Sequence, residues 1–110
     1  MLKNGVYEAI FTAGQTVVGV GAGLHHNGSF VGVDPIHFFR GRLEEAGGEM
    51  HATMELQRHN HAAESVLGDE PLFTLEWRGR PLGNTTFRLT AVHAPSGISL
   101  SVAGRLLREI

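Results

Sequence analysis

The amino-acid sequence predicts an all-β fold, an up-and-down antiparallel barrel of about eight strands. Apolar and polar residues alternate with a period of two along most of the chain, as in strands that bury one face. Turn signals rich in glycine, asparagine and proline interrupt the alternation at roughly ten-residue spacing, and no segment keeps a convincing helical period. Closure into a barrel removes exposed strand edges, but a two-sheet sandwich would give the same periodicity and is the competing architecture.

The first half of the chain holds five expected strands. They cover residues 5–12, 16–25, 29–33, 37–43 and 49–58. In the first strand Tyr7 and Phe11 mark the inward face. In the second, the apolar residues between Val18 and Leu24 form one face, and we expect the alternating glycines on the outer face, where they permit curvature or a close contact in a dimer. The Asn27–Gly28 pair predicts a tight hairpin, because both residues tolerate positive φ.

The second half repeats the pattern in three expected strands, and the segments "EEAGGE", "GRPLGN" and "APSGI" are typical of turns. These strands cover residues 71–78, 85–92 and 98–107. Their alternating apolar positions are Phe73, Leu75, Trp77, Phe87, Leu89, Ala91, Leu100, Val102 and Gly104. The same period of two therefore continues to the end of the chain.

Length and charge indicate one globular domain, residues 1–110, that does not bind nucleic acid. The chain has 110 residues, 42% of them hydrophobic, and a formal net charge of −2. Nucleic-acid binders usually carry a basic patch or stripe. The longest uncharged segment, residues 9–33, is broken by glycines and histidines, so we expect no membrane span. With no cysteine and no leader pattern at the start, we expect a cytoplasmic protein.

No residue pattern predicts an enzyme, a metal site or a cofactor. Among the seven histidines, His59 and His61 would share one face of an extended strand. They could supply two metal ligands, but a zinc site needs three or four. None of the serines stands in the Gly-x-Ser-x-Gly elbow of esterases. We therefore expect no catalytic residue and no metal ligand.

Two features indicate a surface for a protein partner. Glu44, Glu45 and Glu49 cluster in "LEEAGGE", which we expect to be an exposed and mobile turn. Such an acidic turn would steer the encounter with a basic partner surface. Phe38 alternates out of step with Phe39 and stands beside arginines, so we expect it on the outside as an interface residue.

Several aromatic residues fall on faces that we expect to point inward. They are Tyr7, Phe11, Phe39, Trp77 and Phe87. An eight-stranded barrel either fills its interior with side chains or holds one small ligand. The sequence leaves both open, and the second would make the protein a carrier of a small apolar compound, which is the alternative to a partner-binding function.

The order of short motifs along the chain resembles a small bacterial family. The motifs are "NGVYEAIF", "HHNG", "GVDPIHFFRG", "QRHNHAAESVLG" and "VAGRLLREI". Together they span nearly the whole chain and are similar to the family typified by the negative regulator of a type III secretion locus. The residues that carry most of the resemblance are Gly5, Tyr7, Gly28, Asp34, Gly41, Arg58, Ser65, Val66, Leu67 and Gly68.

The resemblance implies a lipocalin-like barrel of reduced size that forms cytoplasmic homodimers and is not an enzyme. The family's best-known member binds and sequesters a DNA-binding transcriptional activator, and an acidic loop matters for that interaction. The corresponding role here would fall to Glu44, Glu45 and Glu49, although Ala46 and two glycines interrupt the acidic run.

The resemblance also implies a structural role for "QRHNHAAESVLG". It places this segment at the corner after the fifth strand. Arg58 and Ser65 would fix the bend, and Val66 and Leu67 would plug one end of the barrel.

Overall fold

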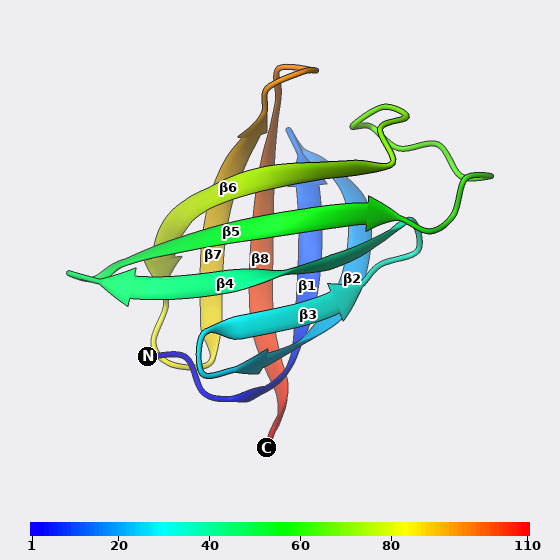
Figure 1. Cartoon of the computed structure of the whole chain (residues 1–110). Coiled ribbons are helices and arrows are strands. Elements are labelled where there is room, and N and C mark those ends of the chain that lie inside the picture. Colours follow the sequence, from blue (N-terminus) through cyan, green and yellow to red (C-terminus); the bar gives the residue numbers. More distant parts are fainter.

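A computed structural model describes residues 1–110 and contains eight strands and no helix (Figure 1). The strands are β1 Gly5–Ala13, β2 Thr16–His26, β3 Ser29–Val33, β4 His37–Ala46, β5 Glu49–Arg58, β6 Leu72–Pro81, β7 Thr86–His93 and β8 Ile98–Glu109. All eight predicted strands are present, with ends that differ by at most a few residues. The structure has no helix long and apolar enough to cross a membrane.

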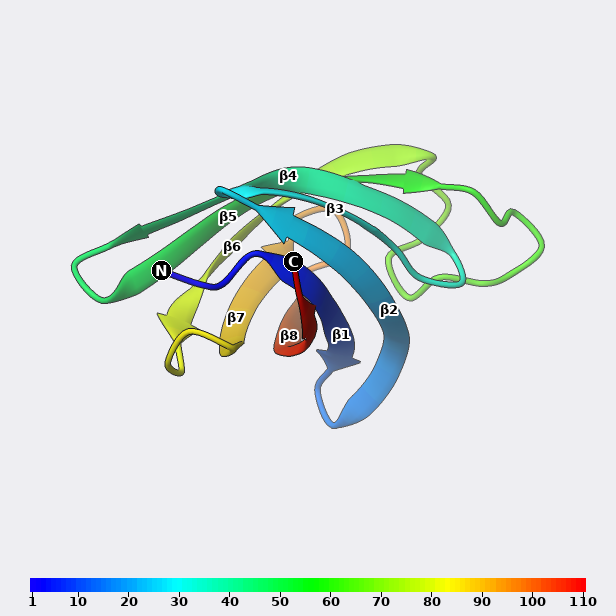
Figure 2. The same ribbon diagram turned by 90° about the horizontal axis from the view of Figure 1, so that it is seen from below.

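The strands close into an up-and-down antiparallel barrel. Each strand pairs with the next one in sequence, and β8 returns to pair with β1. The predicted small lipocalin-like barrel is thereby confirmed, and the sandwich is excluded. Figure 1 shows β4, β5 and β6 crossing in front of β7, β8 and β1, and Figure 2 shows these two groups as opposite layers. The side chains between the layers form the core.

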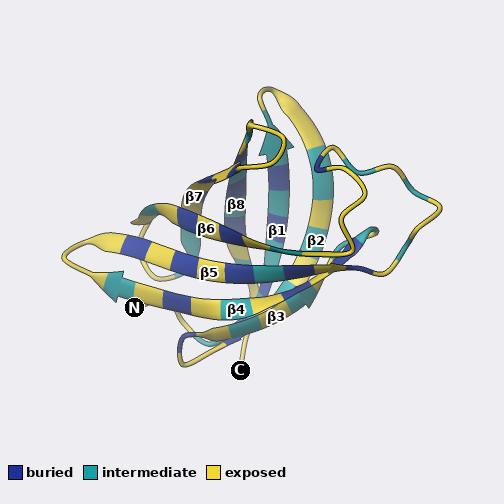
Figure 3. Cartoon of the chain, turned by 45° about the horizontal axis from the view of Figure 1, so that its top comes forward, coloured by how far each residue is buried: buried dark blue, intermediate teal, exposed yellow.

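Alternation of burial along the strands builds that core, as Figure 3 shows for β5. The core contains 17 buried hydrophobic residues contributed mainly by the inward positions of the strands. Trp77 and Met50 are among its most completely buried side chains. Burying large apolar side chains of this kind contributes about 1.5–3 kcal/mol each, so the core is the main source of stability.

The glycines of β2 lie on the inner face, which corrects the prediction that they face outward. A Cβ on Gly21 would lie 2.6 Å from the Val33 carbonyl oxygen, and one on Gly23 would lie 3.4 Å from the Phe39 ring. Because Phe39 takes the space beneath the middle of β2 and β3, Gly23 and Gly32 stand there without a side chain. Val20 and Leu24 of β2 consequently face outward, and Val20 is 51% exposed, whereas Val18 packs against the core.

The two ends of the barrel are closed differently. The N-terminal end carries residues 1–4 and the connections 27–28, 47–48 and 82–85. The loop-capped end carries the connections 14–15, 34–36 and 94–97 together with the long loop 59–71. The hairpins at Asn27–Gly28 and Gly47–Gly48 have positive φ at both central residues, which confirms the tight turn predicted at the first of them.

Strand pairing is incomplete toward the loop-capped end. β6 pairs with β7 only over Arg78–Pro81, and β2 pairs with β3 only over Ala22–His26. The remaining stretches, Leu72–Trp77 and Thr16–Gly21, have no partner on that side, and we call them the two seams. By contrast, β1 pairs with β8 over its full length, Gly5–Ala13. The barrel is therefore tightest around β1 and β8.

Candidate functional site

An apolar cavity of about 70 Å³ lies toward the N-terminal end. Of its 16 lining residues, 14 are hydrophobic. All five aromatic residues that the sequence placed inside the barrel border it, namely Tyr7, Phe11, Phe39, Trp77 and Phe87. Phe11 contacts two of the others, since its ring centroid lies 5.8 Å from that of Phe39 and 6.1 Å from that of Trp77. We call this space the apolar cavity.

The N-terminal segment closes this cavity through hydrogen bonds to Glu45 and Tyr7. Leu2 is 3% exposed and borders the cavity, and its amide donates to Glu45 Oε2 at 2.9 Å. The Tyr7 hydroxyl donates to the Lys3 carbonyl at 2.7 Å. Burial raises the pKa of Tyr7, and the Glu45 and Glu109 carboxylates raise it further. The hydroxyl therefore stays protonated and keeps its donor role.

His25 joins the N-terminal segment to the β2–β3 turn. Its Nε2 accepts from the Gly28 amide at 3.1 Å, so its Nδ1 carries the proton and donates to the Lys3 carbonyl, also at 3.1 Å. The ring also meets Tyr7 edge-on, with centroids 6.2 Å apart. His25 is thus a structural residue, and the neighbouring His26 is exposed.

At the opposite end, Arg58 holds the long loop over the barrel. Its buried guanidinium donates to the carbonyl oxygens of Asn60, Gly68 and Ala63 and contacts the Asp69 carboxylate. Five donors in a rigid fork suit such a set of acceptors, whereas a lysine could not reach them together. The corner role inferred for Arg58 agrees with these contacts.

Other parts of the corner differ from the expectation. Leu67 is 7% exposed and joins the core. Val66 is 45% exposed, so only part of its side chain lines the interior. The Ser65 hydroxyl accepts from the Leu67 amide, which shapes the bend. His59 and His61 lie beyond the end of β5 and not on an extended strand, because the chain turns after Arg58.

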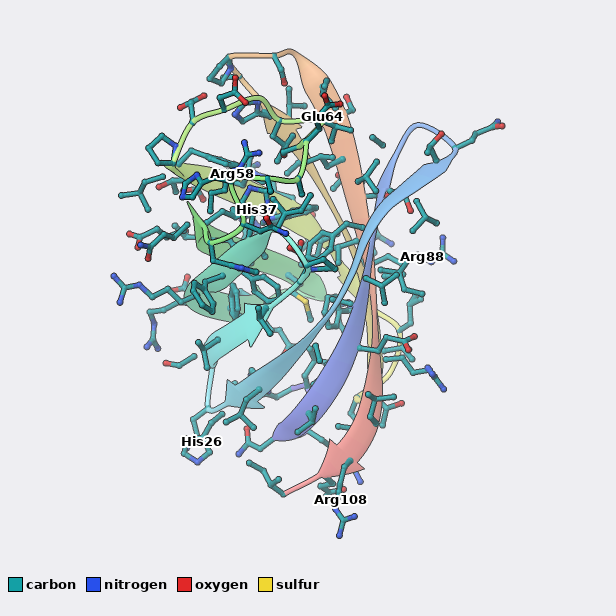
Figure 4. The ribbon with its side chains drawn as sticks, turned by 90° about the vertical axis from the view of Figure 1, so that its right-hand side faces the viewer. His26, His37, Arg58, Glu64, Arg88 and Arg108 are labelled. Atoms are coloured by element: carbon teal, nitrogen blue, oxygen red, sulfur yellow. The ribbon has the colours of Figure 1, made fainter.

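A second cavity, of about 130 Å³, lies beneath this loop. Its lining residues are Phe11, Val18, Gly19, Asp34, Ile36, His37, Leu56, Glu64, Ser65, Val66, Leu67, Leu75, Trp77 and Leu100. We call it the loop-end cavity. Figure 4 shows His37, Arg58 and Glu64 at this end of the molecule, far from His26 and Arg108. The sequence reasoning did not anticipate this cavity.

Three buried side-chain nitrogens have no hydrogen-bond partner, namely His37 Nε2, Trp77 Nε1 and His93 Nε2. His37 and Trp77 both border the loop-end cavity, and Trp77 also borders the apolar cavity. Burial lowers the pKa of His37; the Asp34 carboxylate opposes that shift, and Arg58 and His59 reinforce it. Buried polar groups are usually hydrogen-bonded, so these three nitrogens are exceptions within the barrel.

Three side chains near the β7–β8 turn are of the types found in a catalytic triad of nucleophile, base and acid. The Ser96 hydroxyl lies 2.7 Å from His93 Nδ1, and His93 Nε2 lies 3.5 Å from a Glu70 carboxylate oxygen. However, the Ser96 hydroxyl also contacts the His93 carbonyl and the Ile98 amide, so it ties together the hairpin turn. Its geometry is that of a turn residue.

The acidic residues lie on strands and not in a mobile turn, which corrects the prediction. β4 continues to Ala46, and the turn itself is only Gly47–Gly48. Glu44 and Glu49 are exposed, but Glu45 points to the barrel mouth and accepts from the Leu2 amide. Strand alternation thus separates the three carboxylates into two groups.

Phe38 is exposed, as predicted, and belongs to a larger apolar surface. It is 52% exposed, pairs in register with Val33 and stacks against His59 at a centroid distance of 4.7 Å. The outward residues Val20, Leu24, Val31, Val33 and Phe38 form what we call the apolar strip across β2, β3 and β4. Sequence reasoning missed most of it because it assigned the apolar face of β2 to the interior.

Nowhere do three or more histidine, aspartate or glutamate side chains come together to hold a metal ion. No protein-family model and no curated protein matches the chain.

Proposed function

We propose that the protein is a non-enzymatic binding protein that recognises a protein partner through its outer surface. The observation that carries this proposal is the apolar strip, in which Val31 is 55% and Val33 is 43% exposed. Contiguous exposed apolar surface of this kind is typical of an interaction site. The resemblance to type III secretion regulators makes a DNA-binding transcriptional activator the partner class to test first.

The outer surface of β2, β3 and β4 divides into two contact regions. On β2 and β3 the apolar strip carries only uncharged side chains, so two copies of the chain can pack there without like-charge repulsion. We assign homodimer formation to this part. On β4, Phe38 and Glu44 both point outward, roughly 20 Å apart at the usual rise of a strand. We assign the second partner to this part, with Glu49 at its margin.

The test separates the two regions by substitution. Val31→Lys should convert a dimer to a monomer in sedimentation equilibrium, whereas the same change at exposed Thr74 on β6 should not. A double variant, Phe38→Ser with Glu44→Lys, should stay dimeric but lose binding to a panel of purified transcriptional activators. Binding of an activator that neither substitution weakens would contradict the assigned surface.

A carrier of a small apolar compound is the second candidate, supported by the apolar cavity. The compound should appear, in stoichiometric amount, when protein purified from its own host is extracted with solvent and examined by mass spectrometry. Ala52→Val narrows this cavity because Ala52 borders it and is 3% exposed. The variant should therefore retain less of the compound. An extract without any stoichiometric compound would count against this function.

A further inference from the structure

Three arginines gather on the outer face of β6 and β7. Arg78 and Arg80 lie on β6 and Arg88 lies on β7, and all three residues are exposed. The register of the two strands places Arg80 directly opposite Arg88. Residues in such positions have Cβ atoms about 4.5–5.5 Å apart, and like charges there are destabilising. We call these three residues the arginine patch.

No carboxylate of the chain neutralises the arginine patch, because none of its three side chains takes part in an ion pair. Two carboxylates on the same outer surface are engaged elsewhere. Glu76, two positions before Arg78 on β6, accepts from the Thr53 hydroxyl of β5 at 3.1 Å. Glu8 of β1 contacts Arg105 of β8 at 3.4 Å. The positive charge of the patch is therefore left for a group from outside the chain.

The two opposed arginines lie in the shortest strand pairing of the barrel. β6 and β7 pair only over Arg78–Pro81, and a proline has no amide hydrogen to donate. The longer pairing of β4 with β5 instead carries an attractive pair in register, Arg40 with Glu55, whose charged atoms lie 3.1 Å apart. An anion bound between the two opposed arginines would replace a repulsion with an attraction and would hold β6 and β7 together.

The surroundings of the patch favour a short acidic segment over a long polyanion. The aromatic residues of β6 and β7 are Phe73, Trp77 and Phe87, and all three pack in or against the core. No ring is therefore free on this face for stacking with a nucleic-acid base. Glu76 and Glu8 would repel a DNA backbone or an anionic membrane that extends beyond the patch. A carboxylate side chain fits the guanidinium fork and brings no further charge.

Strand geometry sets the pattern of the acidic segment. Arg78 and Arg80 lie two positions apart on one face of β6, which separates them by about 6.5–7 Å. An extended peptide with an acidic residue at every second position has the same spacing. One carboxylate can then reach Arg78 while the next lies between Arg80 and Arg88.

We propose that the arginine patch docks a short, extended segment of a partner protein that carries acidic residues at alternate positions. In the closed ring of eight strands β7 is four strands from β3, so the patch lies on the opposite side of the barrel from the apolar strip. Figure 4 shows Arg88 pointing outward on this side. A dimer formed through the apolar strip would leave the patch free, so this inference does not depend on the proposed function.

The first test measures the binding of a fluorescently labelled peptide, Ser-Glu-Ser-Glu-Ser-Glu-Ser, by fluorescence anisotropy at low ionic strength. The peptide should bind. The same peptide with glutamine in place of each glutamate should bind about tenfold more weakly or worse, because the charge-assisted hydrogen bonds are lost. Affinity for the glutamate peptide should fall with added salt, which screens exposed charges.

Substitutions assign the contact to the patch. The double variant Arg80→Gln with Arg88→Gln should bind the glutamate peptide about tenfold more weakly than the wild type. Arg40→Gln is the matched control, since Arg40 is also an exposed arginine on an outer strand face, and it should leave the affinity unchanged.

Thermal unfolding of the same proteins gives a second readout. Without peptide, Arg88→Gln should unfold at a slightly higher temperature than the wild type, because the repulsion from Arg80 is removed. The glutamate peptide should raise the unfolding temperature of the wild type but not that of the double variant. This readout also shows that the variants are folded.

Three results would overturn the proposal. Absence of measurable peptide binding at low ionic strength would show that the patch does not hold carboxylates. An equal loss of affinity in Arg40→Gln would mean that the peptide is attracted to positive charge anywhere on the protein. Tighter binding of a seven-nucleotide oligothymidine, with the same dependence on Arg80 and Arg88, would make the patch a nucleic-acid site instead.

Discussion

The two ends of the barrel differ in how their buried polar groups are hydrogen-bonded. At the N-terminal end, Tyr7, His25 and Glu45 each have hydrogen-bond partners, and the cavity that they close is apolar. At the loop-capped end, Arg58 is hydrogen-bonded to the long loop, yet His37 Nε2 and His93 Nε2 have no hydrogen-bond partner. The N-terminal end is thus closed with its polar groups paired, whereas the loop-capped end leaves buried nitrogens unpaired.

The largest expected effect comes from removing the residue that holds the loop. Arg58→Met keeps much of the apolar stem but leaves the carbonyl oxygens of Asn60, Ala63 and Gly68 without their donor. We expect the free energy of unfolding to fall by about 3 kcal/mol in denaturant titrations. Gln57→Met, on the outer face next to it, should change little. A similar loss in both variants would mean that the loop is not held by Arg58.

A somewhat smaller effect is expected at the other end. Leu2→Ala removes the side chain that closes the apolar cavity, and we expect a loss of about 2 kcal/mol. Leu107→Ala is the control, because Leu107 is 51% exposed near the same end. If Leu2→Ala proved as harmless as the control, the N-terminal segment would not contribute to the core.

Removing the Tyr7 hydroxyl tests whether hydrogen bonds stabilise the N-terminal end. Tyr7→Phe removes the donor to the Lys3 carbonyl and should cost about 1 kcal/mol. The raised pKa gives a second readout. Above the ordinary value of 10.0 the unfolded chain ionises first, so wild-type stability should fall as pH rises. This fall should be smaller in Tyr7→Phe, and an unchanged alkaline profile would contradict the assignment.

The smallest expected effect is confined to acid pH. Burial lowers the pKa of His37 below its ordinary value of 6.5, so the unfolded chain takes up a proton before the folded one. Stability from this group is complete above pH 6.5 and is lost as pH falls toward the lowered pKa. His37→Phe should flatten this part of the stability profile measured by thermal unfolding. An identical slope in both proteins would show that His37 is not the group responsible.

Most of the fold follows from local patterns in the sequence. Period-two alternation located every strand, because burial of one face is a property of each strand by itself. The main errors lie where distant residues decide the outcome. β2 presents glycine to the interior because Phe39 and Val33 occupy the space beneath it, and alternation alone does not reveal which face a neighbouring ring will need.

The candidate sites were less predictable for the same reason. The five cavity aromatics and exposed Phe38 could be named from alternation. The separation of Glu45 from Glu44 depends on how far β4 extends before its two-glycine turn. The loop-end cavity depends on the closure of the whole barrel, because its lining comes from β1, β2, β4, β5, β6 and β8 and from the long loop.

The seams on β2 and β6 are where the interior should exchange water with its surroundings most rapidly. Backbone hydrogen bonds of β1 with β8 can break only with the barrel as a whole, whereas the unpaired edges of Thr16–Gly21 and Leu72–Trp77 need only local opening. Amide hydrogen exchange should therefore be fastest along these two edges. Water in the loop-end cavity, which Val18 and Leu75 of these two strands border, would exchange there by local fluctuations while the rest of the barrel stays closed.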